Sequence, residues 1–440
     1  FNGTDNTLWR KLISSPDVLR QRVTLALSEI FVVSMVSLPI GWRGFLAAAY
    51  MDMLEERAFA TYRQLLEGVT LSPAMGLYLN MRGSQKGDPT TGRQPDENYA
   101  REVMQLFSIG LTELNPDGSL KGGKAQDTYT QDTISNLARV FTGWDFDGYT
   151  RADALWTRKP MVHLSTRYDT DAKTFLGVSI PAGTPGPTAL QTVLNVLSEH
   201  PNVAPFISRQ LIQRLVSSQP SAAYVQRVAN VFINNGAGVR GDLKAVIKAI
   251  LLDAEAQQVP AAGNTTAGRL SEPMVRFIQW ARTFNLSSPT DLWNIGSTAD
   301  PVTRLGQSPL RSPTVFNFFR PGYVPGNSPL SALGVTAPEF QITDEVSVAG
   351  WINFAQTFVV SGVGEAAPDY NAELAVAADA TALVKRVALL LAGDSISTST
   401  LNTITTAVNS IVGTTTTGKL NRVYAAVLLV LSAPEYLVQV

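Results

Sequence analysis

The chain has 440 residues, of which 45% are hydrophobic and 16% are charged, a balance that excludes an intrinsically disordered protein and predicts a large core. Its 35 basic and 36 acidic side chains give a formal net charge of −1, so there is no overall attraction to nucleic acid. The absence of cysteine excludes disulfides and thiolate metal sites, and with only His163 and His200 we expect no metal centre.

Two apolar runs are candidates for membrane spans, and neither qualifies. Residues 24–40 contain Glu29 and Pro39, and residues 423–431 are far shorter than the ~20 residues that cross a bilayer. The sequence begins at Phe1, with no positive segment and apolar run of the kind that forms a signal peptide. We therefore expect no transmembrane segment and interpret the chain as processed or trimmed.

Helical periodicity dominates the first part of the chain. Apolar positions recur at helical spacing over residues 7–34, and residues 45–66 are interpreted as a second long helix ended by Gly68. A polar loop over residues 83–96 follows, and Asp96 is expected to cap the helix after it.

The middle of the chain changes character and then returns to helices. Thr130 is predicted to cap a helix that stops at Gly143, and the less helical residues 144–187 are expected to hold a few strands. Helical spacing then returns over residues 188–199, 203–217, 222–234, 242–252 and 272–284.

The last third begins with an unusual loop. Residues 301–338 contain seven prolines and several aromatic residues, which excludes a long helix and predicts an ordered, packed loop. Three further helices are expected near residues 344–360, 372–392 and 418–431, on either side of a stretch rich in Thr and Ser.

These patterns predict a mostly α-helical fold, either a multi-helix bundle or an α/α array, with long ordered loops and at most a few short strands. We expect a main helical domain over residues 1–290, a Pro- and aromatic-rich ordered loop over residues 291–343, and a C-terminal helical lobe over residues 344–440 packed on the main domain.

The densest group of polar residues opens the helix after Asp96. At about 100° per residue, Glu97, Asn98 and Arg101 fall on one polar arc of this helix, and Glu102 follows directly. One interpretation is catalytic: Glu97 or Glu102 acts as acid or base, and Arg101 keeps one carboxylate ionised while a drier environment raises the pKa of the other. The alternative is a solvated helix face with a weak Glu97–Arg101 ion pair.

Several sequence blocks resemble a known bacterial family, called domain of unknown function 1800. The most specific are Asn98-Tyr99-Ala100-Arg101-Glu102 and Phe141-Thr142-Gly143-Trp144, followed by Lys173-Thr174-Phe175-Leu176-Gly177, His200-Pro201 and Glu272-Pro273. The resemblance covers nearly the whole chain and implies an exported protein, but no settled activity. The family often has His-Asp before the Lys-Thr-Phe-Leu-Gly block, where this chain has Tyr168-Asp169. The resemblance also suggests that the polar residues after Asp96 form a shared network, catalytic or structural.

Two other segments supply candidate substrate contacts. The turn after Gly143 carries Trp144 and Asp147, which suit stacking on a sugar ring, although a simple turn is the alternative and a calcium loop is excluded by the missing oxygen ligands. Arg320 and Tyr323 lie in the Pro-rich loop, where a rigid backbone can present them to an anionic or hydroxyl-rich ligand; packing is the main role expected of the neighbouring Phe residues.

Two hypotheses for function follow. The first is an exported, periplasmic or extracellular, enzyme acting on a polysaccharide: Glu97, Arg101 and Glu102 form the catalytic set, and Asn98, Trp144, Asp147, Arg320 and Tyr323 bind substrate. The second is a noncatalytic surface or assembly protein that meets a partner protein of the cell surface, in which the polar helix is a structural network. No nucleotide or cofactor motif is present, so we expect no cofactor.

Overall fold

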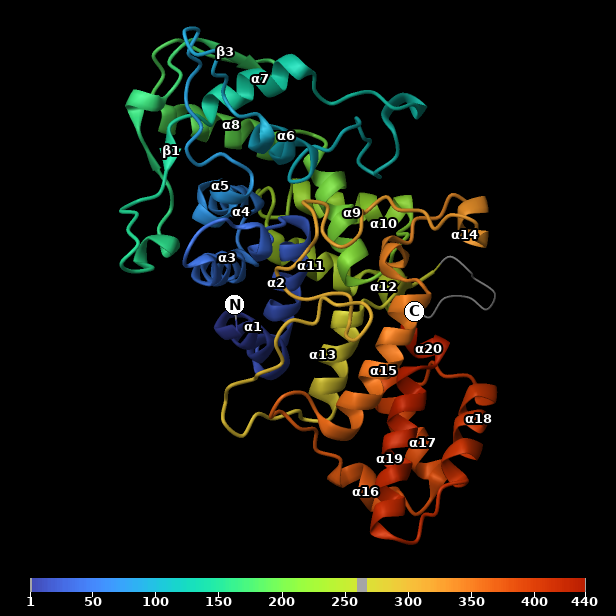
Figure 1. Ribbon diagram of the computed structural model, residues 1–440. Coiled ribbons are helices and arrows are strands. Elements are labelled where there is room, and N and C mark those ends of the chain that lie inside the picture. Colours follow the sequence, from blue (N-terminus) through green and yellow to red (C-terminus); the bar gives the residue numbers. More distant parts are fainter. Residues whose placement is uncertain (1, 259–266, 440) are drawn as a thin grey trace.

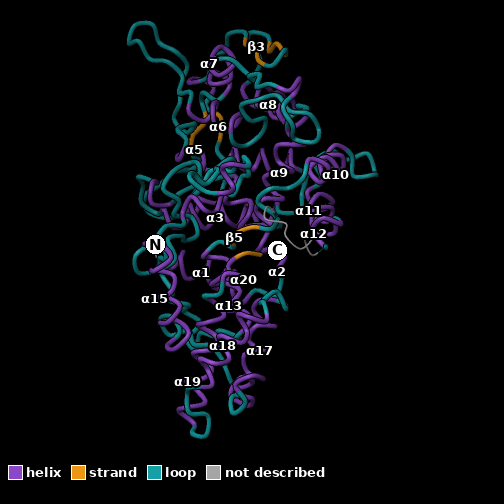
Figure 2. Tube along the Cα trace, turned by 90° about the vertical axis from the view of Figure 1, so that its right-hand side faces the viewer, coloured by secondary structure: helices purple, strands orange, loops and turns teal. Residues whose placement is uncertain are grey.

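The protein is mostly α-helical, as the sequence predicts. The computed structural model describes residues 2–258 and 267–439, and within them it contains 20 α-helices and three two-stranded antiparallel sheets. Figure 1 shows an elongated molecule in which α6, α7 and α8 lie at one end and α16 to α19 at the other. The strands are short segments among the helices (Figure 2).

The first twelve helices are α1 (Asn2–Ser14), α2 (Val18–Ile30), α3 (Arg43–Arg57), α4 (Tyr62–Leu71), α5 (Pro73–Tyr78), α6 (Asn98–Gln105), α7 (Gln131–Val140), α8 (Gly186–Glu199), α9 (Val203–Leu215), α10 (Ala222–Ile233), α11 (Leu243–Leu252) and α12 (Ala254–Gln257). The remaining eight are α13 (Pro273–Thr283), α14 (Pro329–Ala332), α15 (Glu345–Ser361), α16 (Asn371–Val376), α17 (Ala380–Ala392), α18 (Thr398–Asn409), α19 (Thr416–Leu431) and α20 (Pro434–Leu437). The 3₁₀ helices include η3 (Leu155–Arg158) and η5 (Pro338–Ile342).

The strands form three antiparallel pairs. β1 (Trp144–Asp145) pairs with β2 (Val162–His163), β3 (Lys173–Phe175) with β4 (Val178–Ile180), and β5 (Arg269–Leu270) with β6 (Val438–Gln439). The first two pairs lie in the stretch for which strands are predicted. The third brings the C-terminal end of the chain beside β5, near the middle of the molecule (Figure 2).

Three helices expected from periodicity are each divided in the structure. The last of them, over residues 372–392, forms α16 and α17, because Asp379 starts α17 as its N-cap. The first breaks at Pro16, because proline cannot continue a helix from the preceding turn. The second breaks before Thr61, whose side chain accepts a hydrogen bond from the backbone of Gln64 while the Gln64 side chain accepts one from the backbone of Thr61. This capping box starts α4 afresh, and α4 continues past Gly68 to Leu71.

The later expectations hold more closely. Thr130 caps α7 through the backbone N–H of Thr133, and the predicted loop over residues 301–338 is irregular except for the four-residue α14. The Thr- and Ser-rich stretch differs from expectation, because it forms the helix α18, capped by Ser397. Only two of its side chains, Ile404 and Val408, are buried, so its apolar periodicity is weak.

The buried apolar side chains form two clusters. One is built mainly from α2 to α11, and the other from α13 and the helices from α15 onward. α1 contributes Leu8 to the first cluster and Trp9 to the second, and α2 likewise contributes Leu27 to the first and Leu25 to the second. The first two helices therefore lie between the two clusters and join them. Within the described residues, no helix is both long enough and apolar enough to span a bilayer.

Candidate functional site

The helix that carries the predicted polar group is α6. It begins at Asn98, and its N-cap position is held by Glu97, which makes no capping hydrogen bond, so the prediction that Asp96 caps this helix is wrong. Asp96 lies one residue earlier, and its carboxylate accepts a hydrogen bond from the backbone N–H of Asn98 at 2.9 Å in a local turn. The opposite face of α6 buries Tyr99 and Val103 against the core. This amphipathic arrangement turns the Glu97 and Arg101 side chains toward α7.

Glu97 joins the start of α6 to α7. Its carboxylate accepts hydrogen bonds from the Ser135 hydroxyl at 2.6 Å, from the Gln131 amide at 2.8 and 3.0 Å, and from Arg101 at 3.4 Å. The Ser135 hydrogen bond, followed by those from Gln131 and the charge of Arg101, lowers the pKa of Glu97 in spite of partial burial. Glu97 is therefore an ionised carboxylate whose acceptor positions are largely taken by its own protein.

The environment of Glu102 differs from that of Glu97. Its side chain is buried, and its Oε2 has no hydrogen-bond partner among the described residues. Burial raises the pKa of Glu102, against the lowering effect of Arg101. The Tyr129 hydroxyl is also buried without a partner, and burial followed by the charge of Glu102 raises the pKa of Tyr78 to about 12. The buried environment of Glu102 thus favours its neutral form over its charged form, and the charge of Glu102 also raises the pKa of Tyr129.

A surface hollow of about 260 Å³ lies beside these carboxylates. It is lined by Arg101, Gln105, Leu111, Asp127, Tyr129, Thr130, Gln131 and Ile134. Neither Glu97 nor Glu102 lines the hollow itself. Gln131, which does line it, donates a hydrogen bond to Glu97, and the charge of Arg101, another lining residue, acts on Glu102. Asn98 is half-buried at the first turn of α6. Glu97, just before α6, and Glu102, within it, thus have pKa values shifted in opposite directions, as is typical of an acid/base pair.

The other predicted contacts lie elsewhere. Trp144 is only 5% exposed, and its ring packs edge-on against His163 of the paired strand, so it presents no face to solvent. Asp147 is half-exposed and lies 3.5 Å from Lys159. Arg320 is exposed and Tyr323 half-buried in the loop before α14, and neither lines the hollow beside α6. The structure brings together the α6 residues and separates these four from them.

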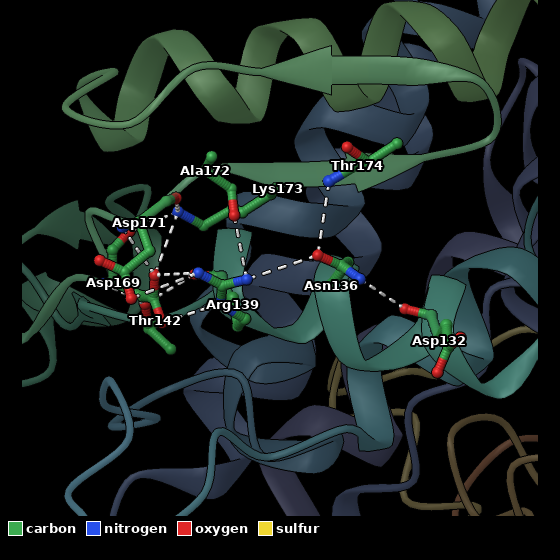
Figure 3. A network of polar contacts seen from close by, with 9 residues as sticks. All are labelled: Asp132, Asn136, Arg139, Thr142, Asp169, Asp171, Ala172, Lys173 and Thr174. Carbon is green, nitrogen blue, oxygen red and sulfur yellow. Dashed lines mark hydrogen bonds and ion pairs between the residues drawn. The ribbon is translucent and has the colours of Figure 1, made fainter.

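A polar network joins α7 to the strand β3 (Figure 3). The Arg139 guanidinium donates to both carboxylate oxygens of Asp169, at 2.9 and 3.0 Å. Lys173, only 3% exposed, lies 3.3 Å from the same carboxylate and donates to the Asp169 backbone carbonyl at 2.5 Å. The backbone N–H of Asp169 in turn donates to the Thr142 hydroxyl. Burial opposes ionisation here, but Arg139 and Lys173 lower the pKa of Asp169.

These contacts join Arg139 and Thr142, at the end of α7 and in the Phe-Thr-Gly-Trp block, to Asp169 and to Lys173 of the Lys-Thr-Phe-Leu-Gly block. The model of the family described as "Protein of unknown function (DUF1800)" matches residues 1–438. This chain belongs to that family. No curated protein and no solved structure matches it.

The DUF1800 block Phe-Thr-Gly-Trp forms part of an aromatic cluster. His163 packs between the rings of Trp144 and Tyr168, at centroid distances of 5.2 and 4.9 Å. A Cβ on Gly186 would lie 2.1 Å from the His163 ring, so only glycine leaves room for it, and Gly143 adopts a positive φ of 82°. Burial lowers the pKa of His163. The Tyr168-Asp169 pair thus has two structural roles, in this cluster and in the network of Figure 3.

Sequence reasoning missed a group of buried charges in this DUF1800 protein, between the two apolar clusters. Arg214 of α9 lies 3.4 Å from Glu29 of α2, and Arg269 of β5 lies 3.2 Å from Glu272. All four side chains are nearly or fully excluded from solvent. Arg22 and Arg269 both donate to the backbone carbonyl of Arg214.

The two carboxyl groups of this buried cluster differ in ionisation. Burial, followed by the charge of Glu272, raises the pKa of Glu29 well above its ordinary range. Burial also opposes ionisation of Glu272, but Arg269, Arg214 and Arg22 together lower its pKa. The pKa values of Glu29 and Glu272 are thus shifted in opposite directions. The sequence signal was Glu29 itself, a carboxyl inside an otherwise apolar run.

The Pro-rich loop covers this cluster. The Gln307 amide donates to Glu272 at 2.9 Å, and the buried side chains of Ser308, Ser312 and Asn317 each have a polar atom without a partner among the described residues. The small cavity between the loop and Glu29 measures about 10 Å³. That is roughly the space of one water molecule, so this cluster supports the fold and admits no polymer.

No ion-binding group was found in the described ranges. Across residues 2–258 and 267–439, no three or more His, Asp or Glu side chains are placed together so that they could hold a metal ion. The candidate site is therefore the α6 carboxylate pair and the hollow beside it.

Proposed function

We propose that this DUF1800 protein acts on a hydroxyl-rich polymer such as a polysaccharide, at the hollow between α6 and α7. One observation carries the proposal: two carboxyl groups five residues apart on one helix have pKa values shifted in opposite directions. Environments that push two carboxyls apart in this way are typical of acid/base pairs that cleave glycosidic bonds.

In this proposal Glu102 is the proton donor. Its raised pKa keeps it protonated at a pH where Glu97 is ionised, and Arg101 lies between the two. Glu97 then serves as the ionised partner, held in place by Ser135 and Gln131. The aromatic ring that lines the hollow is that of Tyr129, which replaces Trp144 as the surface for a sugar ring, because Trp144 is buried.

We also propose that the protein works outside the cytoplasm, in the periplasm or beyond the cell. The support is the family resemblance, since members commonly carry export signals. Fractionation of the native bacterium with an antibody against the chain tests this, and recovery only with cytoplasmic markers would contradict it.

A second candidate function is a noncatalytic surface or assembly protein. The observation that favours it is the satisfaction of Glu97 by internal hydrogen bonds from three side chains, as expected of a helix-to-helix cross-link. In that case the α6 residues stabilise the fold, and a partner protein of the cell surface is bound elsewhere.

Turnover measurements separate the two functions. Purified protein is screened against a panel of polysaccharides, and Glu102→Gln and Glu97→Gln are compared with wild type on any substrate found. We expect each variant to lower kcat by about 100-fold or more, because proton transfer is lost. The rate should fall as pH rises through the pKa of Glu102 and as pH falls through that of Glu97.

The control is Glu345→Gln, an exposed glutamate at the start of α15 in the other cluster of helices. It should turn over substrate like wild type. Wild-type turnover in both α6 variants, with unchanged melting temperatures, would remove the catalytic proposal. Loss of stability without any detectable turnover in the wild type would favour the structural function.

A further inference from the structure

A second cavity is lined by residues 49–73 and 157–160, and no residue of α6 lines it. It has a volume of about 440 Å³, within the range of small-ligand sites. Its walls come from α3, the end of α4, the start of α5 and the segment that follows η3, and Figure 1 shows α3, α4 and α5 lying close together. It is lined by Ala49, Asp52, Met53, Glu56, Arg57, Glu67, Gly68, Leu71, Ser72, Pro73, Thr157, Arg158, Lys159 and Pro160.

The wall formed by α3 and α4 depends on a glycine. A Cβ on Gly68 would lie 2.7 Å from Nε of Arg57 and 2.8 Å from Sδ of Met53. Both side chains line the cavity, so they lie directly over the bare Gly68 backbone. A larger residue at position 68 would push Arg57 and Met53 away from this place. Leu71 and Pro160 add further apolar surface.

Two of the three carboxylates that line the cavity have cationic partners outside its lining. Asp52 is paired with Lys11 at 2.9 Å, and Glu67 with Arg63 at 3.0 Å. Neither Lys11 nor Arg63 lines the cavity. Glu67 also accepts a hydrogen bond from the Gln191 amide at 2.7 Å, and Lys11 is shared between Asp52 and Glu55. Each carboxylate oxygen has two lone pairs, so Asp52 and Glu67 can still accept hydrogen bonds from hydroxyl groups.

The cations of the cavity are less well paired. Arg158 is exposed and has no charged or hydrogen-bonded side-chain partner among the described residues. Lys159 lies 3.5 Å from Asp147, and both of these side chains are about half exposed, so that pair is weak. Arg57 lies 3.5 Å from the largely exposed Glu56. Among the charged side chains that line the cavity, the one without a charged partner in the described residues is thus a cation, Arg158.

We propose that this cavity binds an acidic sugar, with the carboxylate of a uronate unit held by Arg158 and Lys159. The sugar hydroxyls donate to Asp52 and Glu67, and the ring lies against Met53. A neutral sugar would leave the cations unused, and a simple anion would leave the carboxylates and the apolar wall unused. The choice of a sugar rests on the proposed function, whereas the requirement for an acidic group rests on the cavity itself.

Calorimetric titration of the full chain with trigalacturonate tests the proposal, with maltotriose as the neutral probe. We expect trigalacturonate to bind and maltotriose to bind at least about tenfold more weakly. The double variant Arg158→Ala/Lys159→Ala should weaken trigalacturonate binding by about tenfold or more, because a charge-assisted contact is lost.

The matched control removes the same charge elsewhere. Lys244 and Lys248 are exposed on α11 and do not line the cavity, so Lys244→Ala/Lys248→Ala should bind trigalacturonate like wild type. Equal weakening in both double variants would mean nonspecific charge attraction and would overturn the proposal. So would equal binding of the two trisaccharides, or no binding of trigalacturonate by the wild type.

Two further variants separate this inference from the proposed function and from misfolding. Glu102→Gln should leave trigalacturonate binding unchanged, so the cavity proposal stands or falls independently of catalysis at α6. Gly68→Ala should weaken binding by displacing Arg57, with the fold checked by circular dichroism. Unchanged affinity in a folded Gly68→Ala protein would contradict the role of Arg57 in the wall of the cavity.

Discussion

The pKa of the buried Glu29 side chain is set by burial and by its charged neighbours. It lies on α2 with Arg214 beside it, and the charge of Glu272 adds to burial in raising its pKa. The folded protein therefore holds a proton on Glu29 at a pH where the unfolded chain, with a pKa near 4.5, has released it. Folding is consequently less favourable as the pH rises above about that value.

The first prediction concerns this proton. Glu29→Gln mimics the neutral form at every pH, so the free energy of unfolding should decline less between pH 4.5 and the raised pKa than in wild type. The variant should also be at least as stable as wild type at neutral pH. Thermal unfolding followed by circular dichroism over this pH range measures both effects.

A control for the Glu29 experiment is Glu345→Gln, which removes an exposed carboxylate. Its pH profile should match that of the wild type. If Glu29→Gln also follows the wild-type profile, Glu29 is ionised in the folded protein and the described charge arrangement is wrong.

At the scale of elements, the network of Figure 3 attaches the β3–β4 hairpin to α7. Each strand of the hairpin has only three residues, which is too short for a hairpin to be stable alone, so its position depends on such contacts. Asp169 is central to the network because Arg139 and the nearly buried Lys173 both meet its carboxylate.

Asp169→Asn is therefore expected to destabilise the protein by about 3 kcal/mol, because it leaves Lys173 buried without a counter-charge. Urea denaturation measures the change. The matched control is Asp171→Asn, whose side chain is 88% exposed and should change stability by less than about 0.5 kcal/mol. Equal effects from the two variants would show that the network adds no stability.

At the scale of the whole molecule, α1 joins parts of the chain that are far apart in sequence. Trp9 is fully buried against Phe277 of α13, and its indole N–H donates to the backbone carbonyl of Gly296 at 2.9 Å. The second apolar cluster thus contains the first helix of the chain. The division into domains at residues 290 and 343 stays a prediction.

Trp9→Ala should cost about 3–5 kcal/mol through the cavity it leaves. Although the substitution lies near the N-terminus, hydrogen exchange should accelerate most in α13 and α15, whose aromatic side chains lie in the same cluster. Phe45→Ala, at an exposed site, is the control and should leave exchange there unchanged. Faster exchange confined to α1 would contradict the shared core.

Local signals in the sequence were enough to predict most helices. Thr130 caps α7 through its own neighbours in the chain, and proline keeps the loop over residues 301–338 irregular, so both follow from short-range chemistry. The Phe-Thr-Gly-Trp and Lys-Thr-Phe-Leu-Gly blocks were visible in the sequence as well. The sequence did not show that they belong to one network, because the contact between Arg139 and Asp169 joins residues that are 30 positions apart.

Tertiary structure alone decided which polar side chains are buried and what faces them. Glu97 and Glu102 look equivalent in sequence, yet one meets Ser135 and Gln131 on α7 while the other turns into the core, and this difference sets their opposite pKa shifts. Tertiary structure alone also brings together the residues that line the cavity beside Arg158, because they come from residues 49–73 and 157–160. Solvation and charge pairing depend on distances between elements, and helical periodicity carries no information about those distances.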